Sequence, residues 1–305
     1  MSATLLVEQL INGLQLGTML FLMASGLTLV FGVMGLINLA HGAFYMVGAF
    51  VTATVTGATG SFLLGLVAGI LAAAAVGALV ELLVIRRLYH RQHLDQVLAT
   101  FALILIFSEG TRWLFGSSPL WLSPPELLSG SVALPGGSRY PIYRLVIIAV
   151  GVVVATGLYL LISHTRLGMR IRAGESDREM IGALGVNITR LYTLVFALGA
   201  GLAGLAGALV GALQSVQVGM GEPVLILAFV VIVIGGIGSI KGALLGAILV
   251  GVVDTLGRGF LPALFGLFMS PSDAAGVGTA LAAMLIYILM AVILAFKPKG
   301  LFAAN

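Results

Sequence analysis

Long apolar runs separated by short polar segments dominate this chain. The runs cover residues 5–34, 36–57, 62–85, 96–115, 142–163, 191–213 and 277–296. Each has the length of roughly 20 mostly apolar residues that a helix needs to cross the hydrocarbon core of a bilayer. The pattern predicts an all-α, polytopic integral membrane protein in which residues 1–305 form a single transmembrane domain.

Residues 224–257 depart from this pattern. Two shorter apolar pieces, 224–235 and 243–257, flank the motif GGIGSIKG. Neither reaches the ~20 residues of a full span, so they are either a re-entrant pair of half-helices or two spans completed by flanking residues. Both alternatives return the chain to the same side, and the total is about eight or nine membrane segments.

The longest polar interruption is the segment 165–190. It carries five arginines and three carboxylates. Moving these eight charges into hydrocarbon would cost roughly 20 kcal/mol, at about 2.5 kcal/mol each. We therefore expect this segment to lie outside the bilayer.

A short helix is predicted within that segment, from about residue 177 to residue 184. Ser176 and Glu179 have the spacing of a capping box, in which each side chain bonds to the backbone N–H of the other residue. Asp177 in the first turn suits the positive end of the helix dipole, and Gly185 suits a left-handed stop.

This short helix is predicted to have an apolar face. Met180, Ile181, Ala183 and Leu184 fall on one arc of a helical wheel. A helix of this length is marginal alone, so its apolar face needs a cover. Either it folds back on its own chain at the membrane surface, or it fits the groove of a soluble partner.

Basic residues indicate the orientation. Arg86, Arg87 and Arg91, the arginines of segment 165–190, and Lys297 with Lys299 all follow apolar runs. Cytoplasmic loops of membrane proteins carry an excess of such residues, and an external N-terminus with a cytoplasmic C-terminus places every basic cluster inside. No basic region precedes the first run, so we expect it to remain as a helix rather than a cleaved signal peptide.

Residues 116–140 are predicted to form an external loop, ordered at least in part. The loop contains Pro119, Pro124, Pro125, Pro135 and the pair Gly136 and Gly137, which interrupt regular helices.

Composition agrees with a membrane protein. Hydrophobic residues make up 60% of the chain and charged residues 9%, whereas soluble domains contain about 25% charged residues. The 42 glycines favour close helix packing, and we assign Gly238, Gly242 and Gly246 as helix-packing glycines. Since there is no cysteine, disulfides and thiolate chemistry are excluded. The net charge of +4 does not indicate a nucleic-acid partner, because the basic residues lie where topology places them.

No catalytic or metal site is predicted. His41 lies in an apolar run without a nearby carboxylate in the sequence, and the other three histidines, His90, His93 and His164, lie at cytoplasmic borders of the membrane. The motif GGIGSIKG lacks the Gly-Lys-Ser/Thr ending of a phosphate-binding loop. The chain is therefore not expected to be an enzyme or to hydrolyse ATP by itself.

Several polar residues within the apolar runs are functional candidates. Ionisable residues inside a membrane are costly and usually face a partner or a water-filled path. Asp254 and Arg258 are four residues apart and can pair on one helical face. Glu81 is a few residues from Arg86, and its side chain is expected to snorkel to the membrane surface. The uncharged candidates for a translocation path are Asn12, Gln15, Asn38 and His41; hydrogen bonding between helices is the alternative for them.

Three stretches together resemble a known family. They are NGLQLGTMLFLMASGLTLVFGVMGLINLAHGAFYMVGA (12–49), RAGESDREMIGALGVNITR (172–190) and VIGGIGSIKGALLGAILVG (233–251). In this order they resemble the permease subunits of branched-chain amino acid ABC importers, specifically the H-type subunit. The resemblance covers nearly the whole chain.

The resemblance implies a permease half-channel in the bacterial inner membrane. Its implied partners are a second, M-type permease, two cytoplasmic ATPases that bind ATP and Mg, and an external solute-binding protein. The implied solutes are branched-chain amino acids or related small polar or carboxylate compounds, and the family also serves urea and amides. An ion-gradient-driven secondary transporter and a purely structural membrane subunit are the alternatives.

The resemblance also assigns a role to segment 165–190, which we call the coupling segment. It corresponds to the cytoplasmic helix through which the ATPases move the permease. Ile181 stands where a small residue is expected in the family. The candidate coupling residues are Glu175, Ser176, Asp177, Glu179, Met180, Ile181, Leu184 and Gly185.

Overall fold

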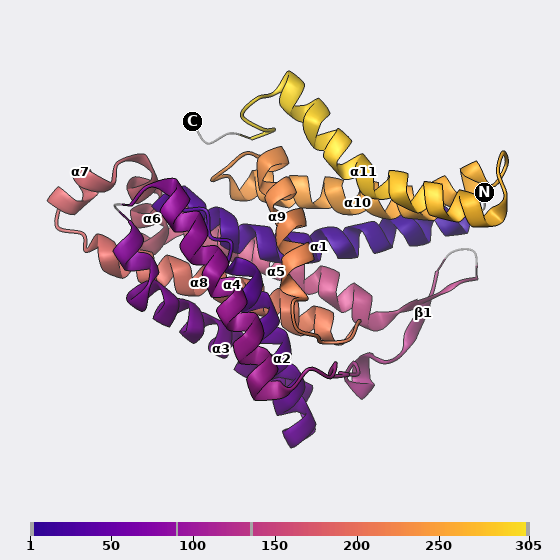
Figure 1. Ribbon diagram of the computed structural model, residues 1–305, viewed down its shortest axis with the longest axis horizontal. Helices are drawn as coiled ribbons and strands as arrows, with labels where there is room; N and C mark the ends of the chain where they lie inside the picture. Colours follow the sequence, from indigo (N-terminus) through magenta and orange to yellow (C-terminus); the bar gives the residue numbers. More distant parts are fainter. Residues whose placement is uncertain (1–2, 90, 135–136, 303–305) are drawn as a thin grey trace. The chain divides into compact units, whose positions relative to one another are not determined.

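The computed structural model describes residues 3–89, 91–134 and 137–302. His90, Pro135 and Gly136 lie outside these ranges. The helices are α1 (Ala3–Met34), α2 (His41–Thr59), α3 (Phe62–Leu83), η1 (Ile85–Leu88), α4 (His93–Phe115), η2 (Glu126–Leu128), α5 (Ile142–His164), α6 (Arg166–Ser176), α7 (Arg178–Ala183), α8 (Ile188–Gly211), α9 (Gly221–Gly235), α10 (Ile240–Phe265) and α11 (Pro271–Phe296) (Figure 1). Two short strands, β1 (Ser131–Ala133) and β2 (Arg139–Pro141), precede α5.

Eight helices in the described ranges are long and apolar enough to cross a membrane: α1, α2, α3, α4, α5, α8, α10 and α11. The fold is therefore the predicted all-α, polytopic membrane architecture. For the second piece of 224–257, the structure agrees with the alternative of a span completed by flanking residues, because α10 has 26 residues. This helix begins earlier, at the Ser239 cap, and continues past Gly257 to Phe265. By contrast, α9 has only 15 residues.

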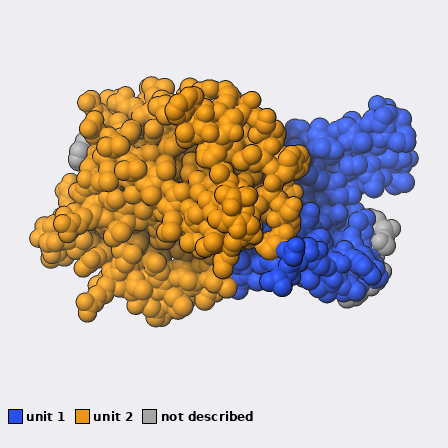
Figure 2. All heavy atoms as spheres, turned by 90° about the horizontal axis from the view of Figure 1, so that it is seen from below, with its two compact units in different colours: residues 1–21, 126–152, 228–305 blue, residues 22–125, 153–227 orange. Residues whose placement is uncertain are grey.

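The chain divides into two compact units, which are coloured separately in Figure 2. Unit 1 comprises residues 1–21, 126–152 and 228–305, and unit 2 comprises residues 22–125 and 153–227. The boundaries fall inside α1, α5 and α9, so each of these helices contributes to both units.

In unit 1, α10 packs along α11 (Figure 1) and along the first half of α1. Gly13 and Gly17 of α1 lie against Val252 and Ala247, so α1 and α10 run in opposite directions. The end of the chain returns to the turn before α10, where the Leu301 N–H donates to the Ile234 carbonyl at 2.9 Å. The C-terminal residues and this turn therefore lie at one end of unit 1, and the start of α1 lies at the other.

In unit 2, α2, α3 and α8 form a closely packed group. Small residues make this possible, since the backbones of Gly48 and Gly204 are in direct contact. Large side chains fill the space beside them, among them Phe44, Phe196 and Tyr45, which are at most 1% exposed.

The predicted external loop contains more regular structure than expected. Strands β1 and β2 pair antiparallel, with Val132 opposite Tyr140. Pairing of only three residues per strand leaves a weak signal in the sequence, and the pattern of prolines conceals it.

Candidate functional site

The coupling segment forms two helices rather than one. The first, α6, is capped by Thr165, whose hydroxyl accepts from the Gly168 N–H at 3.0 Å. Its inner face carries Ile171 and Gly174, and Gly174 lies close to Leu191 of α8. Sequence reasoning missed this helix because its four charged residues masked the apolar residues that contact α8.

The start of the second helix, α7, corrects the predicted capping box. Ser176 is the last residue of α6, and Asp177 is the N-cap of α7 instead of a residue in its first turn. Asp177 Oδ1 accepts from the N–H groups of Glu179 at 3.0 Å and Met180 at 2.9 Å. Since one carboxylate satisfies two free donors, the cap lies one residue later than the Ser-x-x-Glu pattern predicts.

The end of α7 has the predicted glycine stop. Gly185 has a φ of +86°. Its N–H donates to the Gly182 carbonyl at 3.0 Å, and the Val186 N–H donates to the Ile181 carbonyl at 3.2 Å. This pair of bonds is the Schellman motif, which satisfies the last carbonyls of a helix.

Burial divides the predicted apolar face of α7. Ile181 is only 6% exposed, whereas Met180 is 60% and Leu184 is 76% exposed. The assignment of Ile181 to a partner-facing surface is therefore corrected, because its own chain covers it. Met180 and Leu184 remain open to a partner, together with the exposed carboxylates of Glu175 and Glu179. Desolvation raises the pKa of the Glu175 carboxyl.

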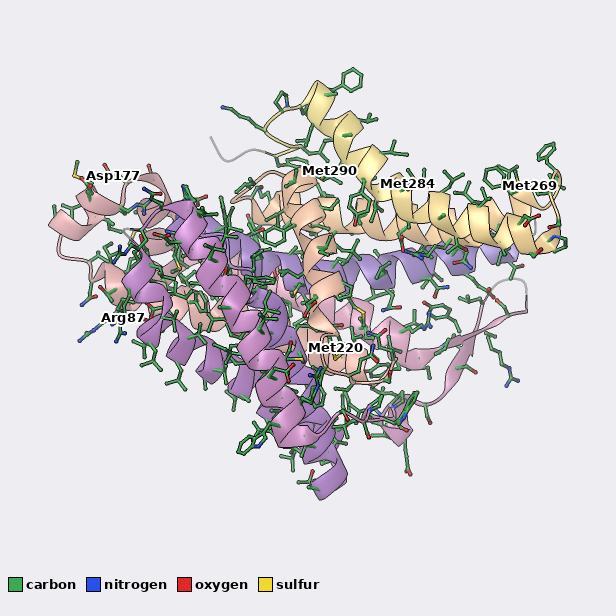
Figure 3. The ribbon with its side chains drawn as sticks, in the orientation of Figure 1. Arg87, Asp177, Met220, Met269, Met284 and Met290 are labelled. Carbon is green, nitrogen blue, oxygen red and sulfur yellow. The ribbon has the colours of Figure 1, made fainter. Side chains whose placement is uncertain are left out.

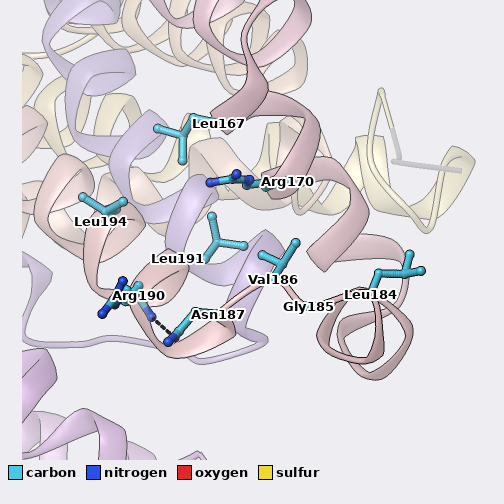
Figure 4. Close-up of a pocket in the computed structure, with 9 residues that line it drawn as sticks. All are labelled: Leu167, Arg170, Leu184, Gly185, Val186, Asn187, Arg190, Leu191 and Leu194. Carbon is cyan, nitrogen blue, oxygen red and sulfur yellow. Dashed lines mark hydrogen bonds between the residues drawn. The ribbon is translucent and has the colours of Figure 1, made fainter.

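A cavity of about 430 Å³ lies beside the exposed Leu184, between α6 and the start of α8 (Figure 4). Leu167 and Leu191 line it, and the guanidinium groups of Arg170 and Arg190 border it. Asn187 caps α8 at this edge by accepting from the Arg190 N–H at 3.0 Å. The coupling segment therefore presents both an exposed apolar side chain and a basic, partly apolar recess.

A buried carboxylate fixes the neighbouring loop. Glu81 is fully buried, and it accepts from Arg86 Nη2 at 3.1 Å, from Thr193 Oγ1 at 2.7 Å and from the Tyr89 hydroxyl. The hydrogen bond to Glu81 raises the pKa of Arg86, and desolvation raises that of Tyr89. The expectation that Glu81 snorkels to the surface is therefore wrong, because the carboxylate is buried in an ion pair with Arg86 that extends to α8 through Thr193. The neighbouring Arg87 extends into the open (Figure 3).

The candidate path residues lie in two places. Asn12 and Gln15 are on α1 in unit 1, where Asn12 Oδ1 accepts from Tyr140 at 2.9 Å and from Arg144 at 2.7 Å. Gln15 is buried and contacts Met19 Sδ. The Asn12–Arg144 contact could not be predicted from the sequence, because 132 positions separate the two residues. Desolvation raises the pKa of Tyr140.

Asn38 and His41 lie in unit 2, at the break between α1 and α2. Both side chains are fully buried. His41 Nε2 lies 3.3 Å from the Met23 carbonyl, but His41 Nδ1 and Asn38 Nδ2 have no hydrogen-bond partner among the described residues. Unsatisfied buried polar atoms cost about 1–3 kcal/mol. Most buried polar atoms in proteins have at least one hydrogen-bond partner, so these two atoms stand out, as do several others in the described residues.

The three helix-packing glycines differ in role. Gly238 is not in a helix: it has a φ of +85° in the turn between α9 and α10, which corrects its assignment. Gly242 and Gly246 are in α10 and face α9. A Cβ at Gly242 would lie 2.1 Å from the Gly235 carbonyl oxygen, so no larger residue fits without movement.

The described residues contain no group of three or more His, Asp or Glu side chains that could hold a metal ion. The clusters that are present are ion pairs and hydrogen-bonded carboxylates. Their chemistry suits binding and helix positioning.

Comparison with known proteins assigns this chain to a family. Residues 9–294 match the family described as the branched-chain amino acid transport system permease component. The chain belongs to this permease family. It is 33% identical over 265 residues to the high-affinity branched-chain amino acid transport system permease protein BraD of Pseudomonas aeruginosa, covering 82% of this chain and 86% of that protein.

More distant relatives extend the comparison. The corresponding permease protein LivH of Escherichia coli is 30% identical, with 84% of this chain and 87% of that protein covered. The ribose import permease protein RbsC of Escherichia coli is 27% identical, with 81% and 77% covered. No solved structure matches the chain. The permease is thus a multi-pass membrane transport protein.

Proposed function

We propose that this permease is the membrane-spanning subunit of a binding-protein-dependent importer that is driven by ATP. The solutes are branched-chain amino acids or related small polar or carboxylate compounds. The observation that carries the proposal is the family match over residues 9–294 together with an exposed, well-capped α7. The chain itself binds no cofactor; ATP and Mg bind to partner ATPase subunits.

The proposed assembly contains a second permease subunit of the M type, two cytoplasmic ATPases and an external solute-binding protein. The coupling segment and the loop after α3 carry most of the arginines, so we place them in the cytoplasm. The same rule places Lys297 and Lys299 there. The N-terminus and the β1–β2 hairpin then lie on the external side. The membrane is the inner membrane of a bacterium.

In this proposal α7 transmits the work of ATP hydrolysis. A partner groove holds Met180 and Leu184, and Ile181 ties α7 to its own chain. Movement of α7 is passed to α5 and α8, which flank the coupling segment. The path opens alternately to the two sides, and Asn12, Gln15, Asn38 and His41 contribute to its lining.

Reconstitution in liposomes tests this proposal. Leu184→Glu puts a charge on the exposed coupling face, and it should lower ATP-driven leucine uptake by at least about tenfold, since a desolvated unpaired charge costs several kcal/mol at an interface. Leu127→Glu is the matched control, because Leu127 is 93% exposed in η2, and it should transport normally.

A secondary transporter would give a different result. The wild-type chain alone would then take up solute along an ion gradient without nucleotide, and Leu184→Glu would have no effect. A purely structural subunit would show no path, so that changes at Asn38 or His41 would alter only assembly.

A further inference from the structure

A polar cavity in unit 1 is not explained by helix packing. It has a volume of about 390 Å³ and lies between α1, α5 and α10. Its lining includes Gln9, Asn12, Gln15, Arg144, Asp254 and Arg258. This cavity is a shallow depression that is open on one side rather than enclosed, and its volume is within the range of about 300–1,000 Å³ of small-molecule sites.

Two guanidinium groups and one carboxylate meet in this cavity. The Nε–H of Arg258 is shared by both oxygens of Asp254, at 3.0 and 2.9 Å, and the terminal nitrogens of Arg258 bond to no described residue. Arg144 donates to Asn12 at 2.7 Å and lies beside the Tyr140 phenol. Because a guanidinium has five N–H donors, both arginines retain donors for a carboxylate.

The position of these charges favours a water-accessible cavity. Asp254 and Arg258 lie inside a helix that is long enough to span a membrane. Charged side chains within such helices face a path or a partner rather than lipid. Both arginines are partly open to the surroundings, since half of the Arg258 side chain is exposed and Arg144 is only half-buried.

We propose that this cavity is a solute subsite for zwitterionic α-amino acids. Arg144 and Arg258 bind the carboxylate of the amino acid. Asp254 binds its ammonium group, and the ion pair between Asp254 and Arg258 loosens when it does so. The lining carries one more positive than negative charge, so the carboxylate is the principal contact. The identity of the solute class and its direction of travel rest on the proposed function.

Binding to the purified full-length permease tests the subsite without ATP. Radiolabelled leucine should bind saturably, and Arg144→Gln should weaken it by at least about tenfold, since a charge-assisted hydrogen bond is lost. Arg144→Lys should restore part of the affinity. Arg139→Gln removes a neighbouring exposed arginine from β2 and should leave binding unchanged.

Two analogues separate the roles of the charges. Leucinamide lacks the carboxylate and should bind weakly to the wild type, with no further loss in Arg144→Gln. The deaminated acid 4-methylvalerate should lose little affinity in Asp254→Asn, whereas leucine should lose about tenfold or more.

The proposal is overturned if the wild type shows no saturable binding at millimolar leucine, or if correctly folded Arg144→Gln and Asp254→Asn bind leucine as the wild type does. It is also overturned if the thermal stability of both variants falls while the leucine affinity of the folded fraction is unchanged, which is the result for a purely structural cluster. Leucine binding without ATP-driven uptake would contradict the proposed function and leave the subsite supported.

Discussion

The carboxylate of Asp177 determines where α7 begins. It accepts two backbone N–H groups, at 3.0 and 2.9 Å, that have no partner within the helix. Asp177→Ala should destabilise α7 by about 1 kcal/mol, which raises the population of its open state roughly fivefold. Amide hydrogen exchange at Glu179 and Met180 measures this change.

Ser176→Ala is the matched control, since the hydroxyl of Ser176 caps no helix among the described residues. Its exchange rates at Glu179 and Met180 should equal those of the wild type. Faster exchange in Ser176→Ala than in Asp177→Ala would support a capping box at Ser176 and contradict Asp177 as the N-cap.

Neighbouring residues explain why the sequence misplaced this cap. Serine and aspartate are both favoured N-caps, and here they are adjacent, so the pattern cannot rank them. Gly185 was predictable because few residues tolerate a positive φ. The contacts of Asn12 with Arg144 and of Glu81 with Thr193 were not, since only the folded chain brings residues so far apart together.

The membrane helices were predicted closely because a bilayer requires one long apolar run for each span. The predicted runs 62–85 and 142–163 are helices α3 (Phe62–Leu83) and α5 (Ile142–His164). Glycine and charge interrupt the apolar run of α10, so the sequence left open whether residues 243–257 form a half-helix or part of a full span. Its Asp254–Arg258 ion pair, at 2.9 Å, removes much of the cost of those charges.

The contact between α9 and α10 depends on the absence of a side chain at Gly242. A Cβ there would lie 2.1 Å from the Gly235 carbonyl oxygen, which is backbone and cannot rotate away. Gly242→Ala should therefore force the two helices apart and lower the thermal stability of the purified permease by several degrees, at a cost of about 1–3 kcal/mol.

The matched control is Gly57→Ala in α2, where an added Cβ meets nothing within 4 Å. This variant should be as stable as the wild type or more stable by about 0.5–1 kcal/mol, because alanine favours the helix. Equal melting temperatures for Gly242→Ala and the wild type would show that α9 and α10 are not in close contact.

Basic residues gather at one end of unit 2 and at both ends of unit 1. In unit 2, Arg86 is bonded to Thr193 at the start of α8, and the arginines of the coupling segment lie beside the same helix. In unit 1, the turn before α10 carries Lys241 and lies next to the C-terminal segment with Lys297. The positive-inside rule therefore supports the proposed orientation through unit 2. In unit 1 the count is balanced, because Arg139, Arg144 and Arg258 lie towards the opposite end, near the start of α1.

Cysteine labelling can test this topology directly, because the 305-residue chain contains no cysteine. A membrane-impermeant maleimide should label Leu127→Cys and Gln217→Cys from outside the cell. Leu184→Cys and Ile237→Cys should react only in inside-out vesicles. All four positions are exposed, so a lack of reaction reports the side of the membrane rather than burial.

Ile237 is the decisive position, because it lies in the turn between α9 and α10. The backbone pairing of Leu301 and Phe302 with Ile234 and Gly235 holds this turn at the C-terminal end of unit 1. If the C-terminus is cytoplasmic, then α9 must carry the chain from the external residue 217 to the inside, although it has only 15 residues. Labelling of Ile237→Cys from outside would instead make α9 re-entrant, and the proposed orientation of the C-terminal half would be wrong.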